Sequence, residues 1–298
     1  MKAFVNLILV DKKASREKIV VAASSVAAAV FLTGFKLVVG IVTGSLGIIS
    51  EALHSALDLV AAGITWFAVR VSDKPADTDH HYGHGKIENL SALIETFLLL
   101  ITCVWIIYEA ISRLVSGETH IEVTAWSYIV VVTSIIIDIS RARALKRVAI
   151  KHNSQALEAD ALHFSTDVYS SSVVLLGLVC ADFGIHSADS IAALGVALIV
   201  IYISLKLGRR AVNMLLDRVP DETFRKIKLL LDDFPDIEHY HDLKVRASGA
   251  EIFVEINIHV KEGMSLRESH DISTRIEELI KSKVPRCNVH VHIEPERH

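Results

Sequence analysis

Up to about residue 217, the chain alternates between long hydrophobic runs and short polar connections. Six runs stand out, at about 17–43, 46–70, 87–113, 122–140, 155–181 and 188–212. Each is long enough to cross a bilayer as a helix, because about 20 apolar residues span the hydrocarbon core. Residues 76–219 contain no proline, so helices there can satisfy their own backbone hydrogen bonds without interruption. The pattern predicts a transmembrane domain of six helices over residues 17–217.

Beyond this region the hydrophobic pattern changes to that of a small soluble domain. It predicts a helix, two strands, a helix and a strand, at residues 224–234, 241–247, 252–260, 265–283 and 287–294. A Ser248-Gly249 turn separates the first two strands, as in a β-hairpin. Ser265 followed by Glu268 forms a capping box at the start of the second helix. The order of elements predicts an α+β domain of ferredoxin-like type over residues 218–298.

Composition supports a membrane protein and excludes several other classes. Of the 298 residues 51% are hydrophobic, and the mean hydropathy is +0.42, which rules out disorder and argues against a purely soluble protein. The net charge of −4 provides no positive field for nucleic acid. Cys103, Cys180 and Cys287 lie far apart, so neither a disulfide framework nor a thiolate zinc cluster is expected.

Basic residues predict which side of the membrane each connection faces. The N-terminal arm (residues 1–16) and the start of the first helix carry Lys2, Lys12, Lys13, Arg16 and Lys18. A predicted loop between the fourth and fifth helices carries Arg141, Arg143, Lys146, Arg147 and Lys151. The turn at 43–46 and the loop at 181–189 contain neither Lys nor Arg. With the inner (cytoplasmic) membrane assumed as the host membrane, the positive-inside rule therefore predicts that both termini lie in the cytoplasm.

Two of the predicted helices carry the same pair of residue types four positions apart: His54 with Asp58, and His163 with Asp167. Residues at i and i+4 project from one helical face, and both pairs fall near the middle of their helices. Two imidazoles and two carboxylates form a tetrahedral set suited to zinc. Four protein ligands leave no open position for an activated water, which favours carrying a metal over catalysis.

A single pair of this kind is equally well explained as a hydrogen-bonded His–Asp contact between helices. Ionisable groups at the membrane centre cost about 2.5–3.5 kcal/mol each on insertion scales, so four in matching patterns favour a metal site. Glu95 and Asp138 are interpreted as paired structural carboxylates, and Lys36 as a residue that can snorkel. Asp160, three residues before His163, is the best candidate for a supporting or proton-relay role.

Between the second and third helices, carboxylates and imidazoles are unusually dense. The segment 77–84 contains Asp77, Asp79, His80, His81 and His84. A solvated polar loop is the simpler explanation, but histidine is not a favoured loop residue and this density is typical of metal ligands. The favoured interpretation is a second metal site formed by Asp77, His80 and His84.

The C-terminal domain contains seven of the fifteen histidines: His239, His241, His259, His270, His290, His292 and His298. On the last predicted strand His290, His292 and Glu294 share one face, a pattern that any solvent-facing strand also shows. With His241 on a preceding strand and His270 on the helix, a cytosolic metal-binding surface is the favoured interpretation.

With these residues identified, the chain resembles the cation diffusion facilitators, in their bacterial zinc-efflux branch, over about residues 15–296. The resemblance is carried by Gly44-Ser45-Leu46, the paired HxxxD motifs, the segment Asp77–Glu88 with Gly83-His84-Gly85-Lys86, and the histidine-bearing tail. It implies six transmembrane helices, a ferredoxin-like cytoplasmic domain, and a homodimer that exchanges divalent metal for protons across a lipid membrane.

The resemblance also implies roles for particular residues. The transport site would be His54, Asp58, His163 and Asp167; the loop site would be Asp77, His80 and His84; and a site at the cytoplasmic dimer interface would use His241, His270, His292 and Glu294. Lys86 and Asp217 match a charge pair at the dimer contact, and Leu162 matches an apolar gate. Asn257 stands where a bridging histidine can occur and Glu294 replaces an aspartate, which leaves open whether the tail binds one metal or two.

The resemblance indicates zinc as the metal, both as substrate and as a structural or regulatory ion. In the family, an aspartate in place of His54 accompanies broader metal use, including iron, so His54 indicates zinc, with cadmium or cobalt as mimics. An iron or other divalent-metal transporter, or a non-transporting sensor or scaffold, remains the alternative. The intact quartet argues against the sensor, since a silent partner could lose those ligands. No spacing here provides the general base and open site of a metalloenzyme, so an enzyme is not expected.

Overall fold

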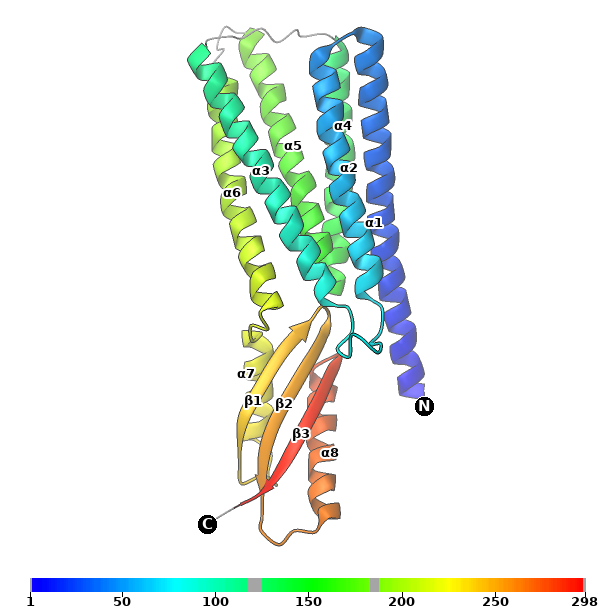
Figure 1. Ribbon diagram of the computed structural model, residues 1–298, viewed down its shortest axis with the longest axis vertical. Coiled ribbons are helices and arrows are strands. Elements are labelled where there is room, and N and C mark those ends of the chain that lie inside the picture. The colour runs from blue at the N-terminus through cyan, green and yellow to red at the C-terminus, as the bar shows by residue number, and fades with distance from the viewer. Residues whose placement is uncertain (1, 117–124, 183–187, 297–298) are drawn as a thin grey trace. The chain divides into compact units, whose positions relative to one another are not determined.

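The computed structural model describes residues 2–116, 125–182 and 188–296, which contain eight helices and three strands (Figure 1). The six long helices are α1 (Lys2–Thr43), α2 (Leu46–Ser72), α3 (Lys86–Ser116), α4 (Ala125–His152), α5 (Gln155–Asp182) and α6 (Ala188–Leu215). They are followed by α7 (Asp221–Asp232), β1 (His239–Ser248), β2 (Glu251–Val260), α8 (Leu266–Lys283) and β3 (Cys287–Pro295). The predicted helix start at 122 and part of the predicted loop at 181–189 lie outside the described residues.

The chain divides into two compact units. The helical unit comprises Met1–Pro75 and Ile87–Val212, and the C-terminal unit comprises Ala76–Lys86 and Asn213–His298. Within the described residues, three segments are long and apolar enough to cross a membrane by length and composition, namely Lys13–Thr43, Ile48–Ser72 and Lys86–Ser112. That all six long helices cross the membrane stays a prediction.

Small residues allow the helices of the helical unit to pack closely. Helix α1 packs against α2 and α4, and α5 packs against α4 and α2. Their contacts are rich in buried alanines, including Ala22, Ala62, Ala142 and Ala161. Alanine lets two helix backbones approach, as is usual between helices in lipid, where van der Waals packing drives association. This close packing places the facing side chains of α2 and α5 against one another.

Helix α4 is longer than the sequence pattern predicts. The prediction of a loop over residues 141–151 is wrong, because these residues continue α4 as far as His152. Arg141 is buried in this extension, where its guanidinium lies 3.2 Å from Asp138 Oδ1 and 3.4 Å from the centroid of the Phe164 ring. The carboxylate and the aromatic face compensate for burying the cation, so the basic residue does not end the helix.

The C-terminal unit has the predicted order of helix, strand, strand, helix and strand. Its sheet has the order β1-β2-β3, with β1 antiparallel and β3 parallel to β2. Helices α7 and α8 cover one face (Figure 1), where Ile227, Ile276 and Ile280 pack against Val254 and Ile256. Among the described residues of this unit no helix covers the other face of the sheet, and polar residues of β1, β2 and β3 project from it.

Two details of this unit matter for the sites. The predicted capping box is confirmed, since Ser265 accepts from the backbone of Glu268 and the Glu268 side chain accepts from Ser265. Strand β1 begins at His239, two residues before the predicted start at 241. The additional pair of residues brings His239 into register with His259 of β2.

Candidate metal-binding sites

The four residues of the paired HxxxD motifs come together between α2 and α5. His163 Nε2 lies 3.1 Å from Asp58 Oδ1 and 3.8 Å from Asp167 Oδ2. His54 Nε2 lies 4.0 Å from Asp58 Oδ1 and 4.0 Å from Asp167 Oδ1. The i, i+4 spacing places each pair on one face of its helix, and helix packing then brings the two faces together. Each imidazole therefore faces two carboxylates.

This cluster leaves a polar atom for which a cation is a fitting partner. Asp167 Oδ2 is buried and forms no hydrogen bond with any described residue. One ligand atom each from His54, Asp58 and Asp167 lies within 4.8 Å of the others. Zinc–ligand bonds are about 2.0–2.2 Å, so small side-chain movements would place these atoms around one ion. The donor set of two nitrogens and two carboxylates suits zinc.

A small cavity lies beside the cluster in the helical unit. Its volume is about 60 Å³, and its lining includes His54, Asp58 and Asp167. Lys36 and Glu51 also line it and form an ion pair of 3.1 Å. Along their helices both lie between the cluster and the α1–α2 turn, so the cavity extends from the cluster toward that turn. Lys36, predicted to be able to snorkel, is buried and paired instead.

The other charged residues of the helical unit have polar partners of their own. Thr65 donates to the buried Glu95, and Ser25 donates to Asp160 Oδ2 at 3.3 Å. Asp138 pairs with Arg141, which belongs to the extension of α4 beyond residue 140. These carboxylates flank the quartet but are not part of the cluster of candidate ligands.

The loop between α2 and α3 gathers its predicted ligands. His80 Nδ1 lies 3.2 Å from Asp77 Oδ1, and His84 Nε2 lies 3.4 Å from Asp77 Oδ2. The two imidazole rings have centroids 4.4 Å apart, and one ligand atom from each of the three residues lies within 4.8 Å of the others. The backbone N–H groups of His80 and Asp79 donate to the Asp77 carboxylate and hold its pKa below the usual range. Asp77 therefore stays ionised, as a metal ligand must.

The same loop packs against the β1–β2 hairpin of the C-terminal unit. Tyr82 forms an edge-to-face contact with Phe253 at 5.2 Å, and the guanidinium of Arg246 lies 4.0 Å from the Tyr82 ring centroid. Lys86 forms an ion pair of 3.0 Å with Asp217, the two residues that the resemblance matched to a charge pair. Here the pair lies within one chain and fixes the end of the loop.

The open face of the C-terminal sheet brings together most of the predicted tail site. His241, Asn257 and His292 are register neighbours on β1, β2 and β3. Asn257 Nδ2 lies 3.4 Å from both His241 Nε2 and Glu294 Oε1, and His292 Nε2 lies 3.6 Å from Glu294 Oε1. His270 lies on α8, and in the described part of the chain no hydrogen bond or ion pair joins its side chain to the other three. Its part in a site at a dimer interface stays a prediction.

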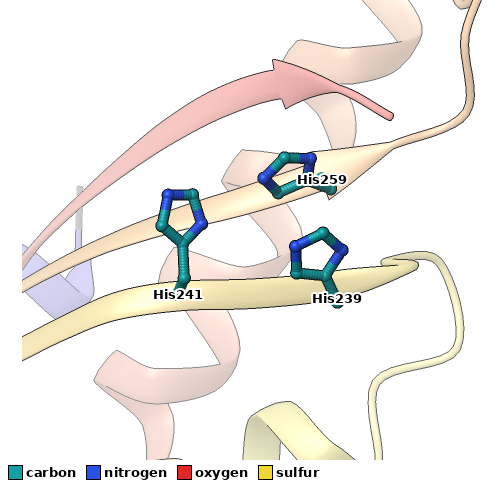
Figure 2. A group of neighbouring side chains, drawn as sticks. All are labelled: His239, His241 and His259. Atoms are coloured by element: carbon teal, nitrogen blue, oxygen red, sulfur yellow. The ribbon is translucent and has the colours of Figure 1, made fainter. Parts of the chain in front are cut away.

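Sequence reasoning missed two histidines of this face. His239 and His259 lie two residues from His241 and Asn257 along their strands and point to the same side of the sheet (Figure 2). Strand alternation was the available signal for His259. His239 was missed because β1 was predicted to begin after it.

Comparison with known proteins follows the same division of the chain. Residues 22–216 match the family model of the cation efflux transmembrane domain, and residues 219–296 match that of the cation efflux protein cytoplasmic domain. The chain is 31% identical over 278 residues to the cation-efflux pump FieF of Pectobacterium atrosepticum, covering 92% of this chain and 91% of that protein. The cation-efflux pump FieF of Escherichia fergusonii is 31% identical over 254 residues, covering 85% of this chain and 84% of that protein. A metal-bound C-terminal domain of the CzcD transporter from Thermotoga maritima is 25% identical, covering 25% of this chain and 87% of that one, with a TM-score of 0.24.

Proposed function

Because the chain belongs to the cation efflux family, the cation diffusion facilitators, we propose that this membrane protein exports Zn²⁺ from the cytoplasm in exchange for protons. Family membership makes it a cation efflux transporter and not an enzyme. The observation that carries the finer proposal is the cluster of His54, Asp58, His163 and Asp167, in which each imidazole lies within 4.0 Å of both carboxylates.

The chemistry of the cluster supports zinc as the substrate. Imidazole binds zinc well and manganese less well, whereas all-oxygen sites suit magnesium, calcium and manganese. Cadmium and cobalt are expected to serve as substitutes for zinc. The site has two ionised carboxylates for one doubly charged ion, so the loaded site is formally neutral. Neutrality lowers the cost of holding the ion away from water.

The same charges provide a reason for proton coupling. When the metal leaves, two carboxylates remain close together in a poorly hydrated site, where like charges repel strongly. Protons taken up from the outer side would neutralise the empty site during its return to the cytoplasmic side. Zinc that binds from the cytoplasm would displace these protons, because the ligands must be deprotonated to bind it. The cycle therefore expels metal and imports protons.

In this proposal the protein crosses the inner membrane six times with both termini in the cytoplasm. Its functional divisions are an arm (1–16), a transport domain (17–217) and a metal-binding domain (218–298). It acts as a homodimer. The loop residues Asp77, His80 and His84 bind a second zinc ion, supported by their distances of 3.2 and 3.4 Å. Zinc at the C-terminal domain regulates the dimer when cytosolic metal is high, which requires different affinities in different states.

Metal-driven proton flux in proteoliposomes tests the proposal. A zinc gradient imposed on the native protein is expected to produce a matching change in internal pH. Asp58→Asn removes one charge of the cluster and should abolish the flux. Glu158→Gln provides a matched control, because Glu158 is exposed on α5 and pairs with Arg210 at 2.8 Å. Zinc movement without proton movement would overturn antiport, and faster transport of iron or manganese than of zinc would overturn the assignment of the metal. Zinc binding with no flux at all would favour a sensor or scaffold.

A further inference from the structure

Three histidines form a compact cluster on the open face of the C-terminal sheet, beside the predicted tail site. His239 and His241 project from β1 and His259 from β2, and all three point to the same side (Figure 2). The rings of His239 and His259 are stacked with centroids 3.9 Å apart, and the His241 ring is 5.1 Å from that of His259. One ring nitrogen from each residue lies within 4.8 Å of the others. Three imidazoles thus converge on one point of the sheet.

Two carboxylates at the end of the sheet flank this cluster. Glu296 Oε2 lies 3.2 Å from His239 Nδ1 and 3.2 Å from His259 Nδ1. Glu294 Oε2 lies 3.6 Å from His259 Nε2. Glu296 Oε2 lies at ion-pair distance from both rings but forms no hydrogen bond with a described residue. A carboxylate beside one ring nitrogen can orient an imidazole and leave the other nitrogen for a metal, which makes Glu296 a candidate positioning residue for two of the three rings.

The register of the sheet explains why the imidazoles gather here. Strand pairing places His241, Asn257 and His292 in one row across the sheet, and His239, His259 and Glu294 in the next. The central strand carries an amide, a poor zinc ligand, in the first row and an imidazole in the second. His241 Nδ1 is buried and has no hydrogen-bond partner among the described residues. An atom of this kind is satisfied by a metal ion as well as by a proton donor.

We propose that His239, His241 and His259 bind one Zn²⁺ ion within a single chain, that Glu294 completes the set of four ligands, and that Glu296 orients the rings. Three nitrogens and one carboxylate oxygen make a tetrahedral zinc site. The site shares His241 and Glu294 with the predicted dimer-interface set of His241, His270, His292 and Glu294 and takes its place, because it uses neither His270 nor His292 and needs no second chain. It goes beyond the proposed transport function and does not depend on it.

Zinc stoichiometry of the purified full chain tests this site. The protein is stripped with a chelator, dialysed against micromolar Zn²⁺, and its bound zinc is counted per chain. The double variant His239→Asn, His259→Asn is expected to bind one zinc ion fewer than the native chain. His290→Asn is the matched control, because His290 lies on the same face of β3 but outside the cluster. Its stoichiometry should equal that of the native protein.

Two further variants distinguish the competing assignments. His270→Asn should leave the stoichiometry unchanged, and Glu296→Gln should weaken binding about tenfold by loosening the two rings. An unchanged zinc count in the double variant, with native far-ultraviolet circular dichroism, would overturn the proposal. Loss of the same ion in His270→Asn would also overturn it and would assign the metal to the dimer-interface set. If the double variant does not fold, the zinc affinity of Glu296→Gln still tests the site, because weaker binding is expected for that variant.

Discussion

The Nε2 atom of His163 on α5 lies 3.1 Å from the Oδ1 atom of Asp58 on α2, so a hydrogen bond between helices joins the two HxxxD pairs. Within each helix the paired atoms are farther apart, at 4.0 Å for His54 and Asp58 and 3.8 Å for His163 and Asp167. A small shift of α2 against α5 would therefore alter the contact between helices first. A site built in this way can respond to small sliding movements of packed helices.

Metal selectivity is expected to depend on His54. Its side chain is 38% exposed, against 4% for that of His163, so replacing it disturbs the packing least. His54→Asp exchanges a nitrogen ligand for a harder oxygen ligand and should favour manganese and iron. We expect the ratio of zinc to manganese flux to fall about tenfold, which corresponds to ~1.4 kcal/mol. Competition between the two metals in proteoliposomes measures the ratio.

His54→Asn is the control for this change, because it removes the imidazole without adding a carboxylate. It should reduce the flux of every metal and create no preference for manganese. If His54→Asp and native protein show the same flux ratio, His54 does not set selectivity.

A buried ion network is expected to stabilise the helical unit. Lys18 of α1 is only 3% exposed and lies 2.6 Å from Asp73 and 2.9 Å from Glu88 of α3. Ser72 and Ser154 donate to the same Glu88 carboxylate at 3.1 and 2.5 Å. Removing one partner of a buried ion pair typically costs about 3–5 kcal/mol, because a charge is left uncompensated. Since Asp73 remains beside Lys18, we expect Glu88→Gln to lower the free energy of unfolding by about 3 kcal/mol.

Thermal unfolding in detergent, followed by circular dichroism, compares this variant with Glu158→Gln. The Glu158–Arg210 pair is exposed and should contribute only about 0–1 kcal/mol. Equal melting temperatures for the two variants would show that the buried network adds no more stability than a surface pair.

The features predicted well from sequence are those that depend on neighbours along the chain. An i, i+4 pair such as His54 and Asp58 shares a helical face wherever the helix packs, and the Ser265–Glu268 capping box is complete within four residues. The features that were missed depend on distant partners. Lys18, counted among the basic residues near the arm, is buried against Glu88, 70 positions away.

The same distinction explains the errors in α4 and at the sheet. A run of basic residues after position 140 resembles a loop until the contacts of Arg141 with Asp138 and Phe164 are known. His239 is indistinguishable from a loop residue by its own sequence context. It joins β1 because Glu238 N donates to His259 O and His239 pairs in register with His259.

Burial of Cys287 at the start of β3 is expected to make its alkylation strongly dependent on pH. Burial raises the pKa of this thiol to about 11, because the interior disfavours the thiolate. The thiolate is the reactive form, and at pH 8 only about one thiol in a thousand should be ionised. The rate with iodoacetamide should rise about tenfold per pH unit from 8 to 10. Peptide mass spectrometry follows this residue separately from the other cysteines.

Protein in denaturant provides the reference for this measurement, since the unfolded thiol has a pKa of about 8.5. A native rate at pH 8 that matches the denatured rate would mean that β3 does not bury Cys287. The register that places His292 and Glu294 beside β2 would then be wrong as well.

Contact between the α2–α3 loop and the β1–β2 hairpin is expected to require glycine at position 85. A Cβ atom built on Gly85 would lie 2.6 Å from the carbonyl carbon of Ser248 and 2.9 Å from the backbone nitrogen of Gly249. Backbone atoms cannot move aside as a flexible side chain can, so Gly85→Ala should push the loop off the hairpin. Overpacking of this kind typically costs about 1–3 kcal/mol. Amide hydrogen exchange over residues 76–86 should accelerate, and zinc binding by Asp77, His80 and His84 should weaken.

Gly63→Ala is the matched control, because nothing lies within 4 Å of a Cβ at that position of α2. If Gly85→Ala leaves exchange in the loop unchanged, the loop does not depend on the hairpin for its conformation.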